Sequence, residues 1–271
     1  MEWRQLESVS YWTLFVITFL AVAAWETRQP NRDWIVPAGR RWTIHGILIT
    51  VSAIISGAIL GLSPVMAALA ASKNSWGLLN QAWMPFWIRL VITVLVLDFV
   101  KYATHRLLHT LPWLWRIHRV HHADPDFDVS TAFRAHPMEF IFVQGAIIGT
   151  ILLLAPPPSA VLVASLIASA FSFFEHANAS LPLWWERRVR PWFVTPDMHR
   201  IHHSEQPLEQ VKNYGEIFPW WDRLLGTYTA EPNGPLVVGL RGFQTIRSMG
   251  AAILLTLPFQ SMREPEREPE A

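Results

Sequence analysis

Histidine is the residue type in this chain whose spacing most clearly points to chemistry. Ten of the 11 histidines lie between residues 105 and 203, and eight of them fall in three short motifs, HRLLH, HRVHH and HRIHH. These eight are His105, His109, His118, His121, His122, His199, His202 and His203. Residues three and four apart share one face of a helix, so each motif directs its imidazoles to one side. Two H-x-x-H-H matches by chance are improbable, and the pattern indicates metal ligands.

The number of histidines indicates more than one metal ion. Eight crowded imidazoles would repel one another if protonated and would leave unpaired nitrogens if buried and neutral, whereas a metal cation is a partner that all of them can share. A structural zinc ion takes four protein ligands and a catalytic one takes three plus water, so the surplus predicts a two-metal centre. An all-imidazole site suits iron, zinc, copper or nickel, and the ligands alone leave the metal open.

Other side chains are candidates to complete the site. His176, in FFEHANASLP, is expected to be a ninth ligand, and His136, in FRAHPME, either binds metal or supports the ligands and the substrate pocket. His45 is isolated in an apolar helix and is expected to be an ordinary buried residue. Because neutral imidazoles do not cancel the charge of two cations, nearby acids should orient the histidines. The acids placed for this, each of which could equally be an ordinary surface residue, are Asp98, Asp124, Glu175, Asp197 and Glu205.

Composition identifies the kind of protein that holds these residues. Of 271 residues, 51% are hydrophobic and 16% are charged, which is typical of a membrane protein rather than a soluble globule. The chain has no cysteine, which excludes disulfides, iron–sulfur clusters, cysteine zinc sites and cysteine nucleophiles. The formal net charge of +1 gives no electrostatic reason to expect a nucleic-acid partner.

The apolar stretches predict an all-α, integral-membrane helical bundle with about four spans. They cover residues 9–25, residues 44–71 with an interruption at Ser63–Pro64, residues 85–104, residues 141–155 and residues 159–174. Three prolines, Pro156 to Pro158, cannot continue a helix and therefore join the last two stretches as a hairpin. Each hairpin arm is short, so it either dips into the bilayer or crosses it where the bilayer is thinned.

Basic residues predict how the bundle is oriented. They cluster at residues 28–41, at residues 101–119 and at residues 187–200, while the loop near residues 72–83 holds little beyond Lys73. The positive-inside rule then places the N-terminus outside and all the histidine motifs on the cytosolic side, in a helical cap. The cluster Arg187, Arg188, Arg190 and Arg200 either anchors this orientation or docks an electron-donating partner.

Taken in order, the motifs resemble the sterol desaturase and fatty acid hydroxylase superfamily of integral-membrane oxygenases. The resemblance runs from about Asp98 to Tyr228, and it is carried by HRLLH, HRVHH, FRAHP, EHAN, HRIHHS and the NYG to WDRLLGTY segment. It implies a helical membrane bundle with a cytosolic cap and a non-haem di-iron centre. It also implies oxygen insertion into, or dehydrogenation of, an unactivated C–H bond of a lipid such as a sterol or fatty acyl chain.

The resemblance also implies a set of ligands and partners. The matching metal ligands are His105, His109, His118, His121, His122, His176, His199, His202 and His203. Some relatives have a further ligand where this chain has Ser172, so His136, Asn178 or water is expected to fill a tenth position. Dioxygen would be the co-substrate. No G-x-G-x-x-G follows a plausible strand and no cysteine relay exists, so electrons must come from a separate reductase or carrier.

We divide the chain into membrane anchor spans at residues 1–75, a fatty acid hydroxylase-like catalytic domain at residues 76–230, and a C-terminal extension at residues 231–271 with a disordered tail, REPEREPEA. Two rival functions are weighed against the oxygenase. A non-enzymatic metal transporter or store would place polar ligands near the middle of the spans, and a two-zinc lipid hydrolase would carry carboxylate ligands. Neither the lipid nor the choice between hydroxylation and desaturation follows from the sequence.

Overall fold

The architecture comes from a computed structural model that describes residues 3–74, 76–81, 83–243 and 250–261. The predicted disordered tail, residues 263–271, lies outside the described residues. All regular elements among the described residues are helices, apart from one isolated bridge between Ser204 and Val238. The prediction of an all-helical chain is therefore confirmed.

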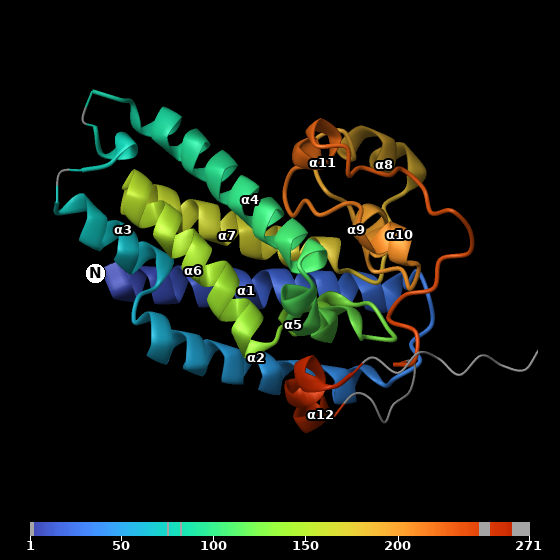
Figure 1. Ribbon diagram of the computed structural model, residues 1–271. Coiled ribbons are helices and arrows are strands. Elements are labelled where there is room, and N and C mark those ends of the chain that lie inside the picture. Colours follow the sequence, from blue (N-terminus) through green and yellow to red (C-terminus); the bar gives the residue numbers. More distant parts are fainter. Residues whose placement is uncertain (1–2, 75, 82, 244–249, 262–271) are drawn as a thin grey trace, which may run out of the picture.

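Five long helices form the bundle (Figure 1). They are α1 (Trp3–Arg28), α2 (Ala38–Leu60), α4 (Phe86–Thr110), α6 (Pro137–Leu154) and α7 (Pro158–Glu175). Helix α1 packs against α7, α2 packs against α6, and α4 contacts both α6 and α7. Helices α6 and α7 thus each contact several other helices and lie at the centre of the bundle.

The breaks between helices follow the local sequence. Helix α2 ends at Gly61, whose φ of +67° is a left-handed conformation that glycine adopts without strain. Ser63 then caps α3 (Pro64–Ser72) by accepting a hydrogen bond from the backbone N–H of Met66, with Pro64 in the first turn. The interruption predicted at Ser63–Pro64 is therefore a capped helix boundary, and α3 turns back onto α6 and α7.

Three helical segments are long and apolar enough to cross a membrane: residues 38–72, residues 137–154 and residues 158–175. The predicted spans at residues 9–25 and 85–104 form α1 and α4, and the expectation of about four spans stays a prediction. Helix α4 does not meet the criterion because it carries Arg89, Asp98 and Lys101 within its apolar stretch. Of these three residues, Asp98 is buried and Lys101 pairs with Glu216.

The shorter elements gather at one end of the bundle, where α1, α4 and α7 finish and α2 and α6 begin (Figure 1). The elements of this cap are α5 (Pro112–His122), η2 (Val129–Phe133), α8 (Leu183–Val189), α9 (Pro196–His202), α10 (Pro207–Gln210) and α11 (Trp220–Leu224). Two further short elements, α12 (Ala251–Thr256) and η4 (Leu257–Phe259), pack on α2 and α5. The remaining turn, η1 (Leu78–Asn80), contacts α6.

The core of the bundle lies where α3, α4, α6 and α7 meet, and its buried members include Val65, Leu97, Ile151 and Val161. The outward faces of the long helices are also apolar. On α2, for example, Ile54 is 66% exposed and Ile59 is 63% exposed. Exposed large apolar side chains in such continuous surfaces are expected where a helix meets lipid rather than water.

Candidate metal centre

Nine histidines from four segments converge inside the cap. Helix α4 brings His105 and His109 in its last two turns, and the end of α7 brings His176. Helix α5 contributes three more histidines and α9 with its C-cap contributes the last three. Those six are His118, His121, His122, His199, His202 and His203. All nine are buried or half-buried, although they come from positions up to 98 residues apart in the chain (203 − 105).

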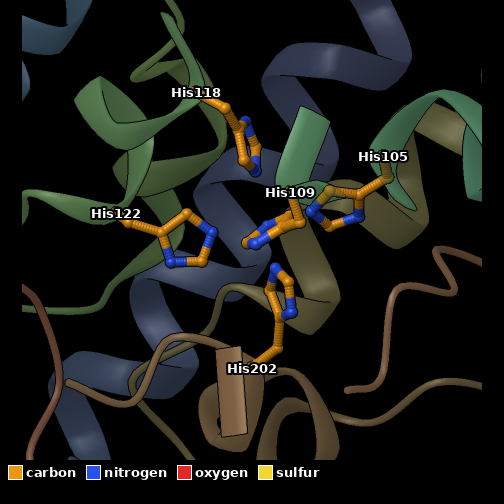
Figure 2. Close-up of side chains that lie close together, drawn as sticks. All are labelled: His105, His109, His118, His122 and His202. Atoms are coloured by element: carbon orange, nitrogen blue, oxygen red, sulfur yellow. The ribbon is translucent and has the colours of Figure 1, made fainter. Parts of the chain in front are cut away.

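The histidines form two groups, each with donor atoms that lie within 4.8 Å of one another. The first group is His105, His109, His118, His122 and His202, whose rings point toward a shared centre in Figure 2. The second group is His121, His176, His199 and His203. Donors on opposite sides of one ion lie about 4 Å apart when each metal–nitrogen bond is about 2.1 Å, so a slight contraction of each group would surround an ion.

Helical spacing decides which histidine belongs to which group. Residues four apart share a group, as His118 and His122 do on α5 and His199 and His203 do at α9. The middle histidine of each H-x-x-H-H motif, His121 or His202, follows the first histidine by three residues and points into the opposite group. A rotation of about 300° for three residues against about 400° for four separates the two directions by roughly 100°.

The ring nitrogens provide a direct test of whether metal fits here. Buried polar atoms in proteins nearly always have a hydrogen-bond partner. In this cluster, however, seven of the histidines have at least one buried nitrogen without one, and in His122 and His203 both nitrogens lack one. In the second group, Nε2 of His176 lies 3.1 Å from Nε2 of His199 and 3.3 Å from Nε2 of His121. Lone pairs directed at one another in this way fit cation ligation.

Burial favours the neutral form of several of the clustered histidines. Burial, with the neighbouring imidazoles adding to it, holds the pKa of His121, His122, His199 and His203 well below the usual 6.5. For His202 burial, followed by the charge of His118, lowers the pKa to about 3. Metal ions bind neutral imidazole, so the buried cluster holds these histidines in the ligating form.

Backbone carbonyls set the orientation of three of these rings. Nδ1 of His105 donates to the carbonyl of Tyr214 at 2.9 Å, and Nδ1 of His202 donates to the carbonyl of Lys212 at 2.8 Å. Nδ1 of His176 donates to the carbonyl of Ser172 at 2.7 Å. In each ring the second nitrogen, Nε2, is thereby left for the shared centre. Ser172 therefore contributes through its backbone, at the position where the resemblance raised the question of a further ligand.

Glu139 is a residue that the sequence analysis did not single out. Its Oε1 accepts a hydrogen bond from Nδ1 of His118 at 2.9 Å, and the side chain is 10% exposed. A carboxylate behind a ligating imidazole fixes the ring and raises the basicity of its other nitrogen. One feature of the sequence could have indicated this role. Glu139 lies in FRAHPME, three residues after His136 and in the first turn of an apolar helix, where a buried acid needs a partner.

Asp98 supports the site through a loop rather than through a histidine. Its carboxylate accepts from the backbone N–H of Ile217 at 3.0 Å and from the indole N–H of Trp221 at 2.8 Å. Asp222 accepts from the backbone N–H of Tyr214 at 2.9 Å in the same loop. These bonds fix the segment whose Tyr214 carbonyl holds His105, which gives the NYG to WDRLLGTY motif a structural role.

Glu175 lies directly beside the second group. Its Oε1 is 3.7 Å from Nδ1 of His176, and its Oε2 is 3.9 Å from Nδ1 of His199. Both distances exceed a hydrogen bond, so the contact is electrostatic. Of the five predicted acids, Glu175 is the one that lies against histidines of the two groups.

Asp124 belongs to a buried ionic network that joins α2 to the segment after α5. It pairs with Arg41 at 2.6 Å, and Arg41 also pairs with Asp128. Burial opposes ionisation of Asp124, but Arg41, Arg134 and His45 together outweigh it and hold the pKa of that carboxyl below its usual range. His45 sits in this network, where it is fully buried between Ser130 and Arg134 and is not part of either histidine group.

Three other candidates lie outside both groups. His136 caps α6 by accepting from the backbone N–H of Met138, and its Nε2 donates to the carbonyl of Leu255 at 3.2 Å. The Asn178 amide bonds to the backbone of Arg32. Glu205 lies 3.8 Å from Arg241. None of the three approaches a histidine donor of the described cluster, because each side chain already serves a local contact.

Asp197 and the arginine cluster also serve the fold. Asp197 pairs with Arg200 at 2.5 Å, and Arg200 donates to the carbonyls of Ala177 and Ala179. Arg200 is therefore buried and structural, so it is not exposed for the docking role considered for the arginine cluster. Arg190 pairs with Glu186, whereas Arg187 and Arg188 lie on an exposed turn of α8.

A cavity of about 770 Å³ leads to the histidines from the apolar part of the bundle. At one end it is lined by members of both groups, including His105 and His176. At the other end it is lined by residues 60–65, around the turn between α2 and α3. Its volume is within the range of pockets that enclose a small organic ligand. The charged side chains in its lining, other than histidine, all lie toward the histidine end.

These features define an all-helical, membrane-type protein with a histidine-rich metal-binding centre. The family model for fatty acid hydroxylase matches residues 90–227, which is half of the chain and includes all nine clustered histidines. The chain belongs to the fatty acid hydroxylase family, within the superfamily that the motifs resemble. The family is one of iron-dependent, membrane-bound oxygenases, so the resemblance is confirmed.

Individual relatives agree with this assignment. The chain is 30% identical to alkylglycerol monooxygenase of Caenorhabditis elegans over 62% of its own length, and 27% identical to ornithine lipid hydroxylase OlsE of Rhizobium tropici over 81%. It is 28% identical to cholesterol 25-hydroxylase of Rattus norvegicus over 53%. The chain spans about a third, two thirds and half of these curated relatives, at 32%, 67% and 47%. No solved structure matches it.

Proposed function

We propose that this chain is a membrane-bound, non-haem di-iron oxygenase that hydroxylates or desaturates an unactivated C–H bond of a lipid. The observation that carries the proposal is the convergence of nine buried or half-buried imidazoles in two groups, with members of both groups lining one end of a largely apolar cavity. The relatives named above are monooxygenases and hydroxylases of lipids, which supports the same reaction class.

Each histidine group would hold one iron ion. His105, His109, His118, His122 and His202 would hold the first, and His121, His176, His199 and His203 the second. When bound, the iron pair supplies the activation of dioxygen that C–H oxidation requires. His136 and Asn178 would not hold the iron pair, because their side chains are engaged elsewhere.

The protein's own groups would position the substrate. The apolar lining from α2, α4, α6 and α7 excludes water and holds a hydrocarbon chain, while Lys101 and Glu216 form an ion pair in the lining near the histidines. The polar part of a lipid would lie against that pair and the reacting carbon against the histidines. We place the lipid among sterols, fatty acyl lipids and related ether or amino lipids, as the relatives' names indicate.

Electrons and orientation complete the proposal. The chain has no cysteine for an iron–sulfur relay, so we infer that a separate reductase or carrier supplies electrons. The positive-inside rule supports a cytosolic position for the cap, which the donor would then reach from that side. Arg187 and Arg188 on α8 are exposed there and offer positive charge for such docking. We retain residues 76–230 as the catalytic domain.

The test measures metal and dioxygen on the same purified protein. We expect about two iron ions per chain by elemental analysis, and dioxygen consumption when the reduced protein meets its lipid. His121→Ala and His202→Ala, one from each group, should each lower the iron content and abolish turnover. His136→Ala is the matched control, because this buried histidine belongs to neither group, and it should keep its iron. A reduced protein that holds no iron and consumes no dioxygen with any lipid extract would refute the proposal.

A further inference from the structure

The cavity has its mouth far from the histidines. Along α7 its lining runs from Leu162 to His176, which is 14 residues, or about 21 Å at the rise of an α-helix. Among all the residues that line it, the exposed ones are confined to α1, α2 and the turn after α2. They are Trp12, Ala53, Gly57, Gly61 and Leu62. The remaining lining residues are buried or half-buried, so the cavity opens between α1 and α2 and closes at the metal centre.

The sequence of α2 keeps this mouth open. Ala53 and Gly57 are one helical turn apart and present almost no side chain to the gap. A Cβ atom added at Gly57 would meet no other atom within 4 Å. The two helices at the mouth are held by different partners, since α1 packs on α7 and α2 packs on α6. The gap between α1 and α2 therefore results from how the helices pack and not from one small side chain.

The surface around the mouth is apolar. Ile54 and Ile59 on α2, and Ile17 and Leu20 on α1, are each more than half exposed. Helix α2 belongs to the segment of residues 38–72, the most apolar of the three candidate spans. A mouth in the side of such a helix opens toward lipid chains and not toward water.

We propose that the mouth between α1 and α2 is a lateral portal through which the hydrocarbon chain of a lipid passes from the bilayer into the cavity. The oxidation of the lipid inside the cavity rests on the proposed function, whereas its entry through the portal does not. The charged side chains of the lining, such as Lys101 and Glu216, lie at the histidine end, so a hydrocarbon chain meets no charge at the mouth. A substrate delivered from the cytosol would instead require an opening among the cap elements.

The absence of cysteine in the chain allows a reversible plug as the test. Ala53→Cys places a single thiol at the mouth, and Ala58→Cys places one on an exposed, non-lining position of the same helix as the matched control. Each variant is treated with benzyl methanethiosulfonate and later with a reducing thiol. The first readout uses metal-free protein in phosphatidylcholine vesicles with a diazirine-bearing fatty acid, and scores photolabel on the interior residues Ile147 and Leu162. The second is lipid-dependent dioxygen consumption by the iron-loaded protein.

The modified Ala53→Cys protein should lose at least tenfold in both readouts and recover both on reduction, while Ala58→Cys should change less than twofold. Unchanged labelling and turnover after modification at residue 53 would overturn the portal. If labelling responds as expected but the unmodified, iron-loaded protein consumes no dioxygen with any lipid, the portal stands and the proposed function fails. The two failures are therefore distinguishable.

Discussion

The hydrogen bond from His118 to Glu139 allows a quantitative test of how the metal centre is organised. Glu139→Ala removes the carboxylate that accepts from Nδ1 of His118 at 2.9 Å and leaves that nitrogen buried. The ring can then rotate, and its Nε2 is no longer fixed on the first group. Removing a partner of this kind typically lowers metal affinity by about 10- to 100-fold, which equals about 1.4 to 2.7 kcal/mol at one site.

The measurement is the dissociation constant for ferrous ion, by competition with a chelator under anaerobic conditions. We expect the apparent dissociation constant for ferrous ion to rise by up to that factor in Glu139→Ala. Glu139→Gln should fall between this variant and the wild type, because its amide oxygen still accepts from Nδ1 but carries no charge. The control is Glu209→Ala, which removes an equally buried acid whose partner is the backbone N–H of Asn233. Equal affinities in Glu139→Ala and Glu209→Ala would refute the reasoning.

Three further substitutions test the support around the site. Asp124→Asn should lower the unfolding free energy by about 3 kcal/mol in mild detergent, because it removes one of the charges that compensate the fully buried Arg41; an unchanged melting temperature would contradict this. His45→Ala should cost about 1 to 3 kcal/mol through lost hydrogen bonds while iron per folded chain stays constant, and a loss of iron would show a role in ligation. Asp98→Ala should free the loop that holds His105, which elemental analysis would register as reduced iron; full iron content with normal turnover would remove Asp98 from the support.

The sequence predicted which histidines belong to the site better than it predicted how they divide into two groups. The spacing in HRVHH and HRIHH identified a metal-binding pattern because helical periodicity is local and strong. Helical rotation separates the directions of His121 and His122, but which rings of other elements join each of them depends on how α5 and α9 face each other, which is a long-range property. His176 was expected from its position after an apolar stretch, and the fold brings it within 3.3 Å of His121.

The supporting residues were harder to predict, for a physical reason. Many acids in a sequence can support a histidine, but the partner is chosen by three-dimensional contact. Asp124 and Asp197 were expected near the histidines and instead pair with Arg41 and Arg200, while Glu139 was not expected and contacts His118. Carbonyl acceptors such as that of Tyr214 carry no side-chain signal at all. The predicted division at residues 75 and 230 stays a prediction.

Adjacent residues on α5 and α9 point into different histidine groups, His121 beside His122 and His202 beside His203. One peptide unit on each helix therefore connects the two centres, and whatever fixes one ring of a pair also restricts its neighbour. Occupancy of one centre should consequently favour occupancy of the other, a positive thermodynamic coupling that holds in both directions. On titration with metal, the chain should pass from empty to doubly filled with few singly filled molecules between.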